Sequence, residues 1–308
     1  IDALTTVARK LRERAAIAKQ SGVECTILRG LLLAAAADAV EPEWRGRAIS
    51  YVLAGGLAAA FIGPELGVLT KDLLAPATFA GCYAVLVGIA LLKMAVLSNL
   101  RFPLPTVEEL TAQGRPLLEI IAQPRYLIAL VCSMVGWGVM ILLMSSTPLA
   151  MQVCNFAFND TAFVIQWHVV GMYAPSFFTG HLIRRFGLPN ILFMGAVLQA
   201  AAITVNLSGI EVWNFLAANV LVGMGWNFLF VGGSTLLTTT YRVEERARAQ
   251  GVHDLLTMGV AAIAAFGSGA LHYLVGWQIV NIAVIPLIIC VLVANLWFRY
   301  TPTPVATE

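Results

Sequence analysis

The chain has 308 residues, of which 59% are hydrophobic and only 12% are charged, and its formal net charge is +2. Soluble domains carry about 25% charged residues, so this composition excludes a water-covered globular domain and predicts a membrane protein. The net charge itself indicates little, whereas the positions of the charges along the chain are informative.

The first 25 residues are basic and partly apolar, which predicts an amphipathic helix at the membrane surface. The next stretch, 26–40, is apolar but short and carries Arg29 and Asp38. If it crossed the membrane, the basic helix would lie outside the cell, against the usual charge rule. Either 26–40 does not cross, or the start of the chain is aberrant through truncation or a reading-frame error. The first residue is Ile1, so we expect the natural start to be absent.

Eight longer stretches are apolar enough to cross a membrane, since a transmembrane helix needs about 20 mostly apolar residues. They show no alternation with a period of two, and backbone groups in lipid must be paired within a segment, so helices are predicted and strands are not. The fold class is therefore all-α integral membrane. The predicted spans are 47–69, 77–98, 126–147, 161–183, 190–209, 213–236, 252–273 and 277–299.

Arginines occupy alternate connections between these spans, while the other connections carry only Lys71. Basic residues favour the cytoplasmic side, so the arginine-bearing turns and the C-terminus are predicted to be cytoplasmic in the inner (plasma) membrane. The arginines concerned are Arg45, Arg47, Arg101, Arg115, Arg125, Arg184, Arg185, Arg242, Arg246, Arg248 and Arg299.

A long polar connection divides the spans into two groups. Residues 99–125 are predicted to form a cytoplasmic loop between bundles, and six spans follow it within 126–300. Residues 26–98 then form the remnant of an N-terminal six-helix bundle, and 301–308 form a cytoplasmic tail.

A short repeat agrees with two related halves. Glu43–Ala48 and Glu244–Ala249 both read E-x-R-x-R-A, and each precedes the span before the last of its half. A chance match is the alternative, because cytoplasmic loops are generally rich in Arg and Glu. We take the charged residues of the two copies as candidate gate residues: Glu43, Arg45, Arg47, Glu244, Arg246 and Arg248.

Two sets of six spans joined by a long cytoplasmic loop resemble the major facilitator superfamily (MFS). Gly180–Gly187 resembles the family's G-x-x-x-D-R-x-G loop, which adds Gly180, Arg184, Arg185 and Gly187 to the gate candidates. Arg184 occupies the usual acidic position, and Pro189 stands where a basic residue is usual. The resemblance implies an MFS-type two-bundle fold with about 8–9 of 12 expected transmembrane helices, truncated at the N-terminus, that rocks about a midplane site.

The segment from Gly63 to Gly67 resembles the family's G-P-x-x-G element, which is associated with antiporters. Pro64 removes a backbone donor and is expected to kink the helix. Gly56, Gly63 and Gly67 allow a neighbouring helix to approach closely.

Two charged residues lie inside predicted spans and away from the terminal positions, where an ionised side chain costs about 2.5–3.5 kcal/mol. Glu65 is a proton carrier or cation contact, or it lies near the outer end and only the kink matters. Lys93 contacts substrate or takes part in proton coupling, or its side chain extends to the headgroups.

Polar side chains on two later spans are the remaining pathway candidates. His168 could relay a proton, or it is a neutral histidine bonded to a neighbouring helix, and Gln166 is a possible substrate contact. Asn219 and Trp226 share a helix face bordered by Asn227, which suits either a cavity wall or hydrogen bonds between helices.

Asp254 opens the span 252–273 together with His253. It either forms a gate salt bridge with Arg246 or Arg248 or is solvated at the membrane interface.

These features favour secondary active transport of a small organic solute, and the G-P-x-x-G element favours proton-coupled efflux by antiport. An importer of a vitamin, sugar or organic acid, or a truncated chain that does not transport, are the alternatives. Neither an enzyme nor an ATP-driven pump is expected, because the chain has no catalytic or P-loop motif. Its scattered cysteines suit packing rather than a metal site. Lipid, a small-molecule substrate and protons are the expected partners of a monomer with no cofactor and no nucleic acid.

Overall fold

The computed structural model describes residues 45–77, 79–98 and 114–300, and within them the chain is helical with no strand. The chain divides into two units, 1–52 and 53–308, and only the start of α3 represents the first. The predictions for 1–25, for 26–40, for Glu43, for most of the loop 99–125 and for the tail 301–308 lie outside the described residues.

Two helices precede the long loop, and both agree with predicted spans. They are α3, Arg45–Thr70, and α4, Ala80–Ser98. Pro64 lies inside α3. The turn between the helices is closed by the Phe79 amide, which donates to the Lys71 carbonyl at 2.6 Å.

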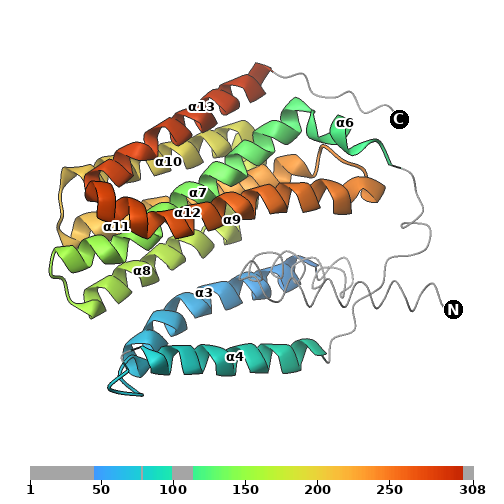
Figure 1. Ribbon diagram of the computed structural model, residues 1–308. Coiled ribbons are helices and arrows are strands. Elements are labelled where there is room, and N and C mark those ends of the chain that lie inside the picture. Colours follow the sequence, from blue (N-terminus) through green and yellow to red (C-terminus); the bar gives the residue numbers. More distant parts are fainter. Residues whose placement is uncertain (1–44, 78, 99–113, 301–308) are drawn as a thin grey trace. The chain divides into compact units, whose positions relative to one another are not determined.

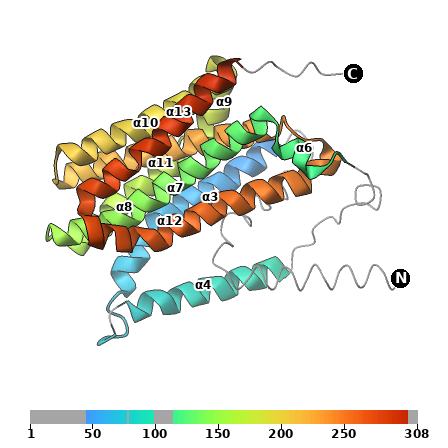
Figure 2. The same ribbon diagram turned by 45° about the horizontal axis from the view of Figure 1, so that its top comes forward.

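The remaining helices form a bundle in which α7 lies among α8, α11, α12 and α13 (Figures 1 and 2). A long apolar helix can be buried on all sides only at the centre of such a bundle, and α7 has buried residues around its whole circumference. The elements are α6 Leu117–Ile121, α7 Pro124–Val153, α8 Phe158–Tyr173, α9 Ser176–Phe186, α10 Leu188–Ser208, α11 Val212–Leu237, η1 Val243–Glu245, α12 Arg246–Ala283 and α13 Ile285–Tyr300.

The structure divides the predicted span 161–183 into two helices at Pro175. Proline has no amide hydrogen, so the helical hydrogen bonds are interrupted there. The predicted break between 273 and 277 is present as Gly276, whose φ of 77° is readily adopted only by glycine.

By length and composition, four described helical stretches can cross a membrane. This is fewer than eight because Pro175 leaves two short helices and because the last stretch contains two predicted spans. The apolar parts of α3 and α4 are also short, at Gly55–Thr70 and Ala80–Ala95. The four stretches are Pro124–Val153, Leu188–Ser208, Val212–Leu237 and Arg246–Arg299.

Glycines let α11 touch the backbones of its neighbours. A Cβ added at Gly223 would lie 2.6 Å from the His168 carbonyl oxygen of α8. One added at Gly225 would lie 2.8 Å from the Gly195 carbonyl oxygen of α10. Such contacts are how membrane helices pack when lipid provides no hydrophobic drive for association. They fix α11 between α8 and α10.

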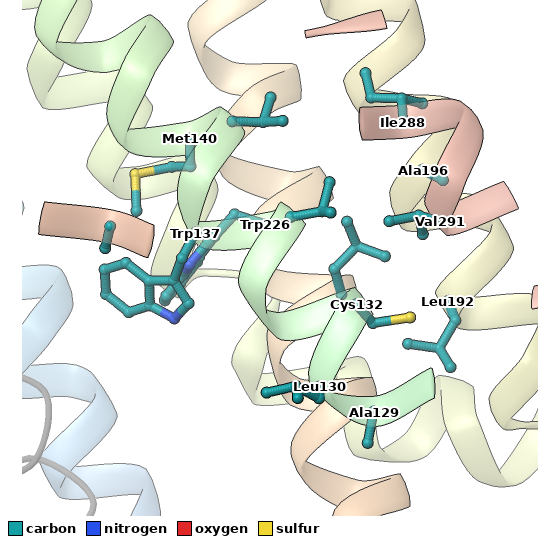
Figure 3. Packing of buried hydrophobic residues seen from close by; sticks show 14 of the residues in the cluster. Ala129, Leu130, Cys132, Trp137, Met140, Leu192, Ala196, Trp226, Ile288 and Val291 are labelled. Carbon is teal, nitrogen blue, oxygen red and sulfur yellow. The ribbon is translucent and has the colours of Figure 1, made fainter. Parts of the chain in front are cut away.

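The apolar core lies between α7, α10, α11, α12 and α13, and Figure 3 shows part of it. Cys132 of α7 is fully buried near Leu192 of α10 and Val291 of α13, in the packing role predicted for the cysteines. Trp137, Trp226 and Met140 belong to the same core.

Candidate functional site

The turns that carry the arginines meet at one end of the bundle, the arginine-bearing end. The Tyr126 hydroxyl at the start of α7 donates to the Ala249 carbonyl at the start of α12, at 2.8 Å. Arg299 at the end of α13 donates to Asn190 at the start of α10, at 2.7 Å. These turns therefore lie at one end of the bundle, as the sequence predicts. The assignment of this end to the cytoplasmic side stays a prediction.

The strongest electrostatic contact at this end joins Arg115 to Glu245. The Arg115 side chain donates to both carboxylate oxygens, at 2.9 Å from Nε and 2.7 Å from Nη2, and its amide donates at 2.8 Å. The Arg242 amide adds a fourth bond at 2.9 Å. The bonds from Arg115 lower the pKa of Glu245 to about 2. The Glu245 side chain is buried beneath the partly exposed Arg115, so the pair joins the segment before α7 to the start of α12.

The sequence predicted a gate salt bridge of Asp254 with Arg246 or Arg248, and it did not identify the pair of Arg115 and Glu245. The candidates Glu244, Arg246 and Arg248 are all exposed. Asp254 contacts His253 at 3.1 Å rather than Arg246 or Arg248. The adjacent pair Glu244-Glu245 was the available signal, because only one of two neighbouring helical positions can face the protein.

The loop after α9 shows why its last residue is glycine. Gly187 has a φ of 84°, which ends α9 and starts α10. Arg184 lies 3.2 Å from the His181 ring nitrogen, while Gly180 and Arg185 are exposed. Arg45 and Arg47 fall in the first turn of α3, and their side chains are not described.

Two predicted pathway residues meet between α8 and α11. His168 is fully buried and its Nδ1 lies 2.7 Å from the Asn219 carbonyl oxygen, which can only accept. The Asn219 amide donates to Thr147 of α7 at 3.0 Å. Gln166 is only partly buried. The contacts of His168 and Asn219 match the alternative in which polar groups join helices.

Asn227 forms hydrogen bonds to residues on both sides of the helix break at Pro175. Its amide donates to the Met172 carbonyl at 2.7 Å and to the Ser176 hydroxyl, while its oxygen accepts from Thr179 at 2.7 Å. Unpaired backbone groups in a membrane are costly, and breaks persist where side chains satisfy them. Asn227 therefore links α11 to both sides of the break.

Replacing Asn227 with alanine should destabilise the protein by about 1–2 kcal/mol, because the Met172 carbonyl loses its donor. The thermal midpoint in detergent measures this. Thr204→Val is the control, since Thr204 is exposed and bonds only within α10. Equal midpoints for Asn227→Ala and the wild type would contradict the role in the break.

Trp226, the remaining candidate on α11, belongs to an aromatic cluster of Trp137, Tyr173, Trp226 and Phe230. Trp226 and Phe230 are stacked with centroids 5.3 Å apart. Trp137 (Figure 3) meets Trp226 edge-on at 5.0 Å. Tyr173 lies 6.1 Å from Trp226. Sequence analysis found only Trp226.

The two indoles of the aromatic cluster have unpaired donors. Trp137 and Trp226 are 8% and 4% exposed, and within the described chain neither Nε1 has a hydrogen-bond partner. Buried polar groups are usually paired, so these two neighbouring donors are candidates for hydrogen bonds to a ligand.

The other candidates lie on α3 and α4. Glu65 and Lys93 are both exposed, and their roles in proton or substrate contact stay predictions. The same holds for the packing roles of Gly56, Gly63 and Gly67 and for the kink at Pro64.

Comparison with known proteins identifies relatives along most of the chain. A family model described as Major Facilitator Superfamily matches residues 161–308. The riboflavin transporter RfnT of Brucella anthropi is 38% identical over 276 residues, which cover 89% of this chain and 69% of that protein.

Two further relatives match shorter segments. The uncharacterized MFS-type transporter YddS of Bacillus subtilis is 32% identical over 151 residues, covering 46% of this chain and 34% of its own. The organic cation/carnitine transporter 2 of Rattus norvegicus is 28% identical over 144 residues, covering 44% of this chain and 24% of its own.

Proposed function

This chain belongs to the Major Facilitator Superfamily, and we propose that the small solute it transports is riboflavin. The observation that carries the proposal is the similarity to the riboflavin transporter RfnT, which extends over 89% of the chain. The matches to YddS and to the organic cation/carnitine transporter cover less than half of it.

The charge distribution of the bundle supports a neutral solute. From α7 to α13 the ionised side chain farthest from a helix end is Asp254, in the third turn of α12. Every other Asp, Glu, Lys or Arg of this region lies at a helix end or in a connection. A phosphate would need arginine or lysine partners, so the bundle suits riboflavin, which is uncharged, better than its phosphate esters.

Among the alternatives left open by the sequence, the similarity to RfnT favours transport of a vitamin. Proton-coupled efflux, which the G-P-x-x-G element predicts, concerns direction and coupling, and it stays a prediction for the same substrate. Both are accessible to one assay.

Riboflavin flux tests the proposal. Membrane vesicles of both orientations that contain the protein should accumulate labelled riboflavin above empty vesicles in at least one orientation. Excess unlabelled riboflavin should abolish the uptake, and flavin mononucleotide should not. Imposing or collapsing a pH gradient then tests the coupling.

Correctly inserted protein that gives no flux in either orientation would reject the proposal. It would then favour the interpretation as a chain that does not transport.

A further inference from the structure

We propose that the aromatic cluster of Trp137, Tyr173, Trp226 and Phe230 is the subsite for the isoalloxazine ring. This inference rests on the proposed function for the identity of the ring. It assigns the ring to residues on three helices: α7, α8 and α11.

The faces of the aromatic cluster suit a planar ring. Stacked and edge-on aromatic contacts hold ring ligands through their large apolar area. Tyr173 and Phe230 are only partly buried, whereas both tryptophans are nearly enclosed. Tyr173 and Phe230 therefore form the more exposed part of the cluster, and the indoles form its inner part.

The unpaired donors specify the chemistry of the ligand edge. An indole nitrogen donates a hydrogen bond and cannot accept one. A ligand that pairs with Trp137 and Trp226 must therefore carry hydrogen-bond acceptors. The pyrimidine portion of the isoalloxazine ring carries two carbonyl oxygens on one edge. A carbonyl that accepts from Nε1 removes the cost of leaving that donor buried and unpaired.

The two unpaired indole donors also argue against an organic cation as the ligand. Aromatic rings can bind a cation through their faces, but a cation leaves both indole donors unpaired. A neutral ring with hydrogen-bond acceptors can contact the faces of the aromatic side chains and also pair with the two indole donors.

Binding to the purified protein tests this assignment, with equilibrium dialysis as the readout. The probes are riboflavin, lumiflavin (the ring without the ribityl chain) and anthracene (a tricyclic ring without a hydrogen-bond acceptor). Trp137→Phe and Trp226→Phe keep an aromatic face and remove the donor. Trp213→Phe and Trp297→Phe are matched controls, because these indoles are 74% and 46% exposed.

We expect each cluster variant to bind both flavins about threefold to tenfold more weakly, the range for one lost hydrogen bond. The affinity for anthracene and the thermal midpoint should change little, which separates loss of a donor from loss of structure. The controls should bind like the wild type, and choline should not compete.

The outcomes separate the two proposals. If the wild type binds riboflavin and both cluster variants bind it equally well, the subsite is wrong and the proposed function stands. If the wild type binds lumiflavin through the indoles but not riboflavin, the ring subsite stands and the proposed function fails. If it binds neither flavin, or if choline competes, the subsite assignment is overturned.

Discussion

Replacing Arg115 with alanine is expected to destabilise the protein by about 2–3 kcal/mol at pH 7. The change leaves the Glu245 carboxylate buried without its cationic partner, and an unpaired buried charge costs more than the pair contributes. The estimate lies below the usual range of about 3–5 kcal/mol because Arg115 is 33% exposed. Thermal unfolding in detergent measures the effect.

Two comparisons make this test specific. Arg185→Ala removes an exposed arginine from the same end and should change the midpoint little. Glu245→Ala added to Arg115→Ala should recover much of the loss, since no charge is then left unpaired. An Arg115→Ala protein as stable as the wild type would show that the pair does not hold α12 to the segment before α7.

The pH dependence of stability at the same ion pair follows from the lowered pKa of Glu245. A carboxyl whose pKa falls from 4.5 to about 2 on folding stabilises the protein above pH 4.5. This contribution decreases as the pH falls toward 2, because the unfolded chain binds the proton first. The difference in midpoint between the wild type and Glu245→Gln should therefore narrow between pH 5 and pH 3.

Hydropathy was sufficient to predict most helices, because lipid imposes apolar side chains along the whole length of a span. The ends of α10 and α11 lie within a few residues of the predicted spans 190–209 and 213–236. The break at Pro175 was missed because the apolar run continues through it. Hydropathy measures side chains, whereas the break comes from a missing backbone donor that Asn227 compensates.

The site was predictable only where its residues are close in sequence. Trp226 was found through its spacing from Asn219 on one helix. Trp137 was not, because its partners lie on other helices and its own helix carries no polar stripe beside it. Arg115 and Glu245 are 130 residues apart, and a single sequence contains no pattern that links such positions.

Replacing Gly223 with alanine is expected to destabilise the protein by about 3 kcal/mol, and Gly225→Ala should act similarly. The new Cβ at Gly223 would lie 2.6 Å from a backbone oxygen of α8, and backbone cannot rotate away as a side chain can. The helices must separate, which also weakens the buried contact between His168 and Asn219. Overpacking usually costs about 1–3 kcal/mol, and a clash with backbone lies at the upper end.

Alanine at Gly259 and Gly267 of α12 provides the matched comparison, because an added Cβ there has no atom within 4 Å. These variants should be as stable as the wild type or slightly more stable, since alanine favours a helix over glycine by about 1 kcal/mol. The sign of the change in stability thus separates the effect of close helix packing from the effect of helix propensity. Equal midpoints for Gly223→Ala and Gly259→Ala would mean that α8 and α11 do not touch through their backbones. The placement of Trp226 against Tyr173 would then lose its support, because the same crossing brings these two rings together.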